Sequence, residues 1–143
     1  MKGYFLGLFS LLLLSSSPAE KVTIFYKGKN VSVTQNIKKE LLGLYRGKGK
    51  GFLKLEKNGT GMYRYDYRIG SCPNESFPIR WGFIKDENGQ PVSFKREYGM
   101  SYPILFQSLK GKQFKGCREE VFLDWLLVKK DGIHVSSSDD WKK

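Results

Sequence analysis

The sequence predicts an all-β fold, an antiparallel meander that closes into a small barrel, and three observations lead to this prediction. Two-residue turn signals recur at Asn58-Gly59, Asn88-Gly89 and Asp131-Gly132, and each dipeptide readily adopts the positive φ angles of a tight hairpin. The segments between these turns are rich in β-branched and aromatic residues. Residues 62–69 alternate with a period of two, which is typical of a half-buried strand. A barrel is favoured over a sandwich because closure removes exposed edges and encloses the aromatic face.

The N-terminal segment has the three parts of a secretory signal peptide. Lys2 gives a charged start, residues 4–14 form an apolar run, and small residues lead up to Ala19. An apolar run of about ten residues is too short to cross a bilayer. We therefore expect cleavage after Ala19, with an uncleaved anchor as the alternative. The product is expected to be one soluble or peripherally attached domain, residues 20–143, in the periplasm or secreted, without a transmembrane span.

After the signal peptide, one short helix and then a series of strands are expected. Residues 36–42 (NIKKELL) have helical spacing, with Asn36 as a plausible N-cap and Gly43 as a plausible stop. In residues 62–69 the tyrosines and Ile69 share one face, while Met62 and the charged side chains share the other. Further strands are expected around residues 79–83, 92–94, 104–106, 121–128 and 133–135.

Residues 121–128 (VFLDWLLV) are apolar on both faces apart from Asp124. Such a run is compatible with a central strand or with a short helix, since periodicity alone does not separate the two. The following turn at residues 131–132 and the run Ile133-His134-Val135 favour the strand. Residues 136–140 are interpreted as a polar tail that follows the last strand.

Export also determines how the two cysteines and the sequons are interpreted. Cys72 and Cys117 both lie in the exported part, and in an oxidising compartment an isolated pair is most simply a disulfide. The alternative is a reactive thiol paired with His134, but no neighbouring group except scattered lysines would lower a thiol pKa. Three asparagines lie in Asn-x-Ser/Thr sequons, which carry glycans only in a eukaryotic secretory pathway: Asn30, Asn58 and Asn74.

The segment in which residues 36–42 run into Gly43-Leu44-Tyr45 resembles the start of a lipocalin-type (calycin) barrel. Those proteins begin with a short helical turn and a Gly-x-Trp at the first strand, and Tyr45 stands where that Trp would be. Residues 51–67 are similar to the first hairpin of small lipocalin-like domains. The resemblance implies a closed barrel. The family also packs an Arg from the last strand against the Trp, whereas here the expected last strands offer only Lys129 and Lys130 at a turn.

The sequence contains no recognisable catalytic or metal-binding motif. His134 is the single histidine of the chain, so a metal site would depend on carboxylates or on the cysteines. A calcium loop would need oxygen ligands at alternating positions and a turn glycine, which are absent. We therefore expect a non-enzymatic protein without a metal or cofactor, although glycosidase carboxylates distant in the chain remain an alternative.

The most distinctive stretch is Arg46-Gly47-Lys48-Gly49-Lys50-Gly51, in a chain of net charge +11. If this stretch is extended, Arg46, Lys48 and Lys50 share one face at a spacing of about 6.6–6.8 Å. The first hypothesis is that this basic surface binds an anionic partner: an acidic glycan, a lipid headgroup, a cell-envelope polymer or an acidic protein. Nucleic acid is disfavoured by export. The alternative is a solvated edge whose lysines prevent aggregation.

Two further hypotheses concern other parts of the barrel. A lipocalin-like carrier would hold an apolar or amphiphilic molecule inside the barrel, against Tyr63, Tyr65, Tyr67 and Trp81. The alternative for this face is a filled core in which each hydroxyl is hydrogen-bonded. The third hypothesis is an inhibitor of an acidic exported hydrolase.

Overall fold

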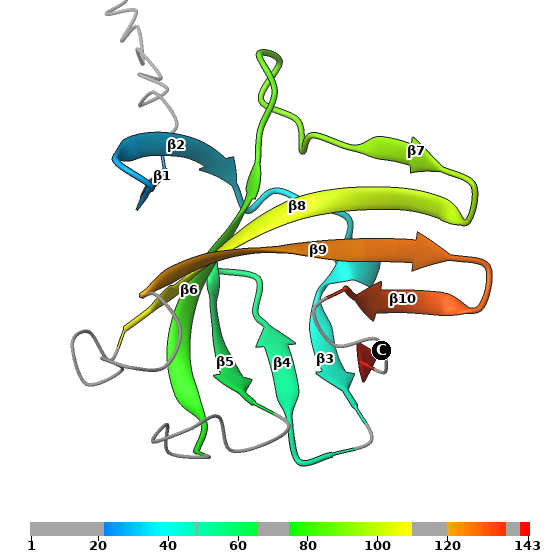
Figure 1. Ribbon diagram of the computed structural model, residues 1–143. Helices are drawn as coiled ribbons and strands as arrows, with labels where there is room; N and C mark the ends of the chain where they lie inside the picture. Colours follow the sequence, from blue (N-terminus) through cyan, green and yellow to red (C-terminus); the bar gives the residue numbers. More distant parts are fainter. Residues whose placement is uncertain (1–21, 48, 66–74, 110–119, 137–140) are drawn as a thin grey trace, which may run out of the picture.

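The protein folds as a closed antiparallel β-barrel (Figure 1). The computed structural model describes residues 22–47, 49–65, 75–109, 120–136 and 141–143. Its elements are β1 (Thr23–Tyr26), β2 (Lys29–Thr34), the 3-10 helix η1 (Lys39–Leu41), β3 (Gly43–Arg46), β4 (Phe52–Leu55), β5 (Thr60–Arg64), β6 (Phe77–Ile84), β7 (Phe94–Arg96), β8 (Gly99–Ser108), β9 (Val121–Lys129), β10 (Gly132–Val135) and β11 (Trp141–Lys142).

The barrel is an up-and-down ring in which each strand pairs with the next ring strand along the chain, β7 being outside the ring. The ring runs β3-β4-β5-β6-β8-β9-β10-β11 and closes where Lys142 of β11 pairs with Arg46 of β3. β6 and β8 pair directly, from Ile79 opposite Ser108 to Phe83 opposite Ile104, and β7 is attached outside the ring to the start of β8. The predicted all-β antiparallel barrel is confirmed.

The β1–β2 hairpin extends the sheet at the far end of β6. Val33 of β2 pairs with Ile84 of β6, while the first half of β6 pairs with β5. The turn of this hairpin is Lys27-Gly28, where both residues have positive φ, 46° and 79°, as a tight two-residue turn requires. Ile24, Val33 and Leu105 form a small apolar cluster under this hairpin, outside the barrel.

The barrel interior is filled by aromatic side chains. Tyr45, Tyr63, Trp81 and Trp141 are at most 1% exposed. Two of these side chains donate hydrogen bonds to backbone carbonyls. Trp81 Nε1 donates to the Thr60 carbonyl at 2.7 Å, and the Tyr45 hydroxyl donates to the Leu41 carbonyl at 2.6 Å. Burial raises the pKa of the Tyr45 hydroxyl. The Tyr45 hydroxyl therefore stays protonated and remains a hydrogen-bond donor in the core.

The helix expected over residues 36–42 is reduced to the single turn η1. Lys38 precedes it with an extended backbone (φ −59°, ψ 135°), so a helix cannot begin at Asn36. The Asn36 N–H instead donates to the Thr34 hydroxyl at 3.1 Å. Leu41 is buried in the core and its carbonyl accepts the Tyr45 hydroxyl. Tertiary packing therefore replaces the local propensity for a longer helix.

The strand predictions agree with β6, β8, β9 and β10, so residues 121–128 form a strand and not a helix. In the segment 92–94 the strand begins only at Phe94, whose side chain is 42% exposed. Gly132 pairs with Lys129, so the turn residues are Lys130 and Asp131, one position earlier than predicted. The expectation that residues 136–140 follow the last strand is wrong, because β11 comes after them and completes the ring.

Several predictions lie outside the described residues. These are the signal peptide of residues 1–19, the cysteine pair Cys72 and Cys117, and two side chains of the predicted sites, Lys48 and Tyr67. Within the described part of the chain, none of the helices has the length and apolar character needed to span a membrane.

Candidate functional site

One side of the barrel, formed by β11, β3, β4 and β5, presents a basic outer surface. Tyr45, Leu53 and Tyr63 of these strands are buried in the core, so the residues that alternate with them point outward. The outward residues, which we call the basic face, are the cations Arg46, Lys54, Arg64 and Lys142 and the apolar residues Leu44, Phe52 and Met62.

The strand register places three of these cations in one row across the sheet. Lys142 pairs with Arg46, Arg46 with Phe52, and Phe52 with Arg64. Neighbouring strands are about 4.8 Å apart, so this row extends over about 14 Å. Lys54 lies between Leu44 and Met62 in the next outward row. The row is therefore a linear array of positive charge with apolar surface between the charges.

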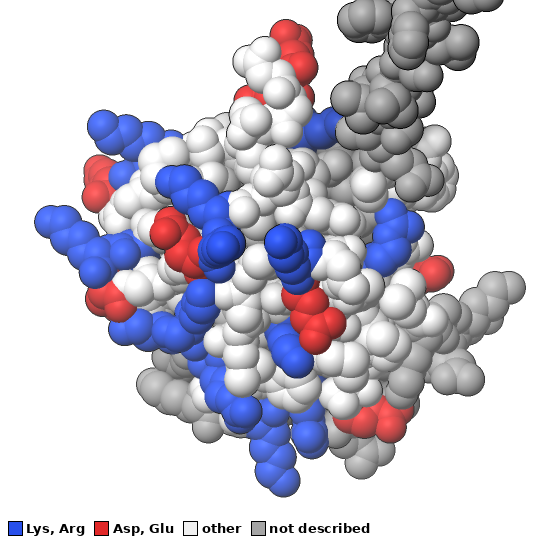
Figure 2. Space-filling view, turned by 180° about the vertical axis from the view of Figure 1, so that it is seen from behind, with Lys and Arg blue, Asp and Glu red and all other residues white. Residues whose placement is uncertain are grey.

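Glu56 and Asp131 contact the basic face at Lys54 and Lys142 respectively; the Lys142 ammonium lies 3.7 Å from Asp131 Oδ2. The four strands contain no Asp or Glu within their described bounds. Glu56, just beyond β4, lies 3.1 Å from the Lys54 ammonium, and this neighbour together with a hydrogen bond from Thr60 lowers the pKa of the Glu56 carboxyl. Lysines and arginines outnumber acidic residues on the rear of the barrel, most densely at the left and lower side of Figure 2.

The predicted contacts Arg46 and Lys50 are both exposed, but they do not lie on one continuous strand. β3 ends at Arg46 and β4 begins at Phe52, so residues 47–51 connect two strands instead of extending one. The cations that share a face come from neighbouring strands. Arg64 and Lys142 were not predicted as contacts; alternation predicts that Arg64 faces outward, but not which strands lie beside it.

The tyrosine face that was considered for a cavity contributes to the core. Tyr63 has five aromatic neighbours with ring centroids between 5.2 and 6.0 Å away: Tyr65, Phe77, Phe106, Phe122 and Trp141. Trp81 is fully buried and lies edge-on to Phe83 at 5.9 Å. Rings at these distances are in contact, which favours the filled core over a cavity at Tyr63, Tyr65 and Trp81.

Comparison with protein-family models, with curated proteins and with solved structures finds no match. Among the described residues, no three side chains of the His, Cys, Asp and Glu types are close enough together to bind a metal ion.

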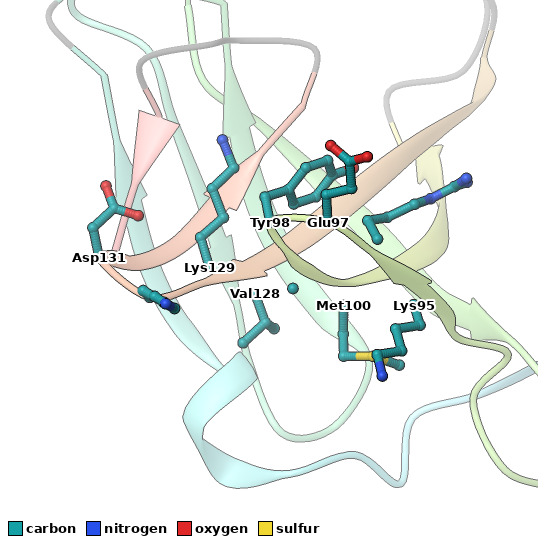
Figure 3. Close-up of a pocket in the computed structure, with 10 residues that line it drawn as sticks. Lys95, Glu97, Tyr98, Met100, Val128, Lys129 and Asp131 are labelled. Carbon is teal, nitrogen blue, oxygen red and sulfur yellow. The ribbon is translucent and has the colours of Figure 1, made fainter.

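Two concave surfaces of the described part of the chain lie outside the basic face. The larger is a groove of about 840 Å³ between the β7–β8 and β9–β10 turns (Figure 3), lined by Lys95, Arg96, Glu97, Tyr98, Gly99, Met100, Val128, Lys129, Lys130 and Asp131. The smaller, of about 430 Å³, lies where the segment around η1 meets the β6–β7 connection and Tyr102. Ile37 and Tyr102 line this pocket and also pack against the hydrophobic core of the barrel. The pocket therefore borders the core.

The His134–Asp131 pair in the β9–β10 hairpin gives a pH prediction. His134 Nε2 lies 3.1 Å from Asp131 Oδ1 and the Lys142 ammonium lies 3.7 Å from Asp131 Oδ2; the hydrogen bond with His134 is the main reason why the pKa of the Asp131 carboxyl is lowered. A group with a lowered folded-state pKa stabilises the fold above its unfolded pKa, and that contribution is lost as the pH falls through the folded pKa.

We therefore expect Asp131→Asn to reduce the melting temperature slightly at pH 5–7, and we expect this difference to shrink as the pH falls through the lowered folded-state pKa of Asp131, because the wild-type carboxyl then also becomes neutral. Thermal unfolding of both proteins between pH 2 and pH 7 measures the difference. Glu87→Gln, a change of an exposed acid in another turn, is the control. A gap in melting temperature that persists unchanged at the lowest pH would contradict this assignment.

Proposed function

We propose that this protein is an exported binding protein whose basic face engages an anionic partner, with Arg46, Arg64 and Lys142 as the central contacts and Lys50 and Lys54 beside them. The observation that carries this proposal is the cross-strand row of three cations on strands that contain no acidic residue. The export part of this proposal is supported by the signal-peptide pattern of residues 1–19.

The geometry of the basic face suits a polyanion or an anionic surface better than a single small ion. Charges in a line about 5–10 Å apart match a repeating row of sulfates, phosphates or carboxylates, and each contact releases condensed counterions from a polymer. Phe52 and Met62 are half-buried between the charges, and they give the alkyl stems of arginine and lysine an apolar surface to lie on. The partner is thus an acidic glycan, a cell-envelope polymer, an anionic lipid headgroup or an acidic protein surface.

The barrel itself supports a lipocalin-like relationship as part of this proposal. The turn η1 leads directly into β3, and the tyrosine at the expected tryptophan position is buried and bonded back to that turn. One observation favours a carrier as the second candidate function, namely the 430 Å³ pocket lined in part by Ile37, Leu41 and Tyr102. A small molecule that co-purifies and is detected by native mass spectrometry would favour the carrier; a bare protein mass would count against it.

Salt dependence tests the main proposal. If four cations of the basic face contact a sulfated polysaccharide, the logarithm of the association constant falls linearly with the logarithm of salt concentration, by roughly 0.7–0.9 per neutralised charge. We expect affinity to fall about 50- to 150-fold between 50 and 200 mM NaCl, measured by isothermal titration with the mature protein, residues 20–143. An affinity that is unchanged over this range would refute the proposal.

A further inference from the structure

The groove in Figure 3 is a separate surface, built by two hairpin turns that extend past the barrel. The β7–β8 turn contributes Glu97 and Tyr98, and the β9–β10 turn contributes Lys130 and Asp131. Between them Gly99 pairs with Lys129. A Cβ at Gly99, where φ is +139°, would lie 1.9 Å from the Val128 carbonyl oxygen, so a glycine is required there. The two turns are therefore held side by side by backbone pairing.

Exposed rings and cations are interleaved in and beside this groove. Tyr98 is 45% exposed and the Lys129 ammonium lies 5.4 Å from its ring centroid. Phe94 is 42% exposed and the Arg96 guanidinium lies 5.4 Å from its ring. Figure 3 shows Tyr98, Glu97 and Lys129 on one side of the strands and Met100, Val128 and Lys95 on the other. Each ring thus offers an apolar surface with a positive charge beside it.

The ring surface continues along the outside of β9. Trp125 is half-buried and its ring is 5.7 Å from that of Phe94. A second hollow of about 230 Å³ shares Arg96 and Tyr98 with the groove and is also lined by Ser101, Trp125, Leu127 and Ser136. The combined surface is long and open, which suits an elongated ligand. It is not an enclosed cavity for a single small molecule.

We infer that this groove binds an acidic saccharide, a sugar chain that carries carboxylate or sulfate groups. Four cations line it against the two acids Glu97 and Asp131: Arg96, Lys129 and Lys130, and Lys95 on the other side of the strands. The cations recognise the anionic groups, and the exposed faces of Tyr98 and Trp125 provide apolar platforms for the C–H faces of sugar rings. Glu97 and Asp131 accept hydrogen bonds from sugar hydroxyls, which are donors throughout the chain.

Glu97 and Asp131 favour an acidic saccharide over a nucleic acid or a membrane surface as the ligand of the groove. Glu97 and Asp131 repel a dense row of phosphates, whether that of a nucleic acid or of a membrane surface, and a hydroxyl-rich saccharide compensates for them by donating to them. The groove is also concave and divided between two turns, whereas a membrane-binding surface presents protruding apolar residues to the bilayer. The inference does not depend on the basic face, which lies on β11, β3, β4 and β5.

Tryptophan fluorescence gives a direct readout, because the chain has three tryptophans and only Trp125 is accessible. Trp81 and Trp141 are 0% and 1% exposed. Titration with a hexasaccharide of alternating glucuronate and N-acetylglucosamine, or with its sulfated counterpart, is expected to change Trp125 emission saturably and to protect it from iodide. Tyr98→Ala is expected to weaken this binding at least tenfold, Arg96→Gln by about fivefold, and Tyr98→Phe by less than twofold.

The controls separate this inference from the proposed function. Arg46→Gln with Arg64→Gln changes the basic face at residues that do not contact the groove and is expected to leave the Trp125 titration unchanged. Trp125→Phe removes the signal and identifies its source. Melting temperatures check that each variant is folded. The inference is overturned if neither acidic hexasaccharide changes Trp125 emission, if a neutral N-acetylglucosamine hexasaccharide binds equally well, or if Tyr98→Ala weakens only binding to an oligonucleotide or to anionic vesicles.

Discussion

Trp141→Ala is expected to lower the free energy of unfolding by about 3–5 kcal/mol, the usual effect of truncating a buried aromatic residue. Trp141 is 1% exposed and its ring lies 5.2 Å from that of Tyr63 at the centre of the core. It also belongs to β11, the two-residue strand that joins β10 to β3 and so closes the barrel. The substitution therefore leaves a cavity and weakens the narrowest pairing in the ring.

The measurement is urea unfolding followed by circular dichroism. Domains of this size have a total stability of roughly 5–15 kcal/mol, so we expect a large shift of the midpoint and a melting temperature lower by about 10–20 °C. Lys142→Ala is the matched control, because that side chain belongs to the same strand but faces outward; its effect should stay within about 0.5 kcal/mol. If Trp141→Ala were as stable as Lys142→Ala, the burial of the Trp141 side chain would contribute little to the stability of the barrel.

This strand also shows where sequence reasoning reached its limit. The longer strands were predictable because their alternation or apolar content is strong within eight to ten residues, as in β8 and β9. β11 has two residues and follows a run of Ser and Asp, so no local pattern marks it. The burial of Trp141 depends on Tyr63 and on the pairing of Lys142 with Arg46, contacts between residues far apart in the chain.

The candidate site was partly predictable for the same reason. The charge and spacing of the sequence identified Arg46 and Lys50 as exposed cations, and the structure exposes both. The partners Arg64 and Lys142 come into the same row only through the register of three strand pairs, and register depends on the core as a whole. The groove was not predicted, since Tyr98 and Lys129 lie in or beside different turns that a long-range strand pair brings together.

Neutralising the row of three cations is expected to have the largest effect on binding. Each cation near an anionic surface contributes on the order of 1 kcal/mol. The triple variant Arg46→Gln, Arg64→Gln, Lys142→Gln should therefore bind a sulfated polysaccharide about 100-fold more weakly at low salt. Its salt dependence should also be shallower, with a slope reduced by roughly 2–3. Titration calorimetry over a salt series measures both quantities.

A control of equal charge distinguishes the basic face from the net charge of +11. Lys27→Asn, Lys29→Gln and Lys85→Gln remove the same three charges from the β1–β2 hairpin and the end of β6, and asparagine tolerates the positive φ of residue 27. If a diffuse positive field attracted the partner, both triple variants would lose affinity alike. Because adjacent cations in register bind a linear array of anions together, we expect the control to keep most of the affinity. Equal losses of affinity in the two triple variants would refute a localised basic face and would attribute binding to the net positive charge of the protein.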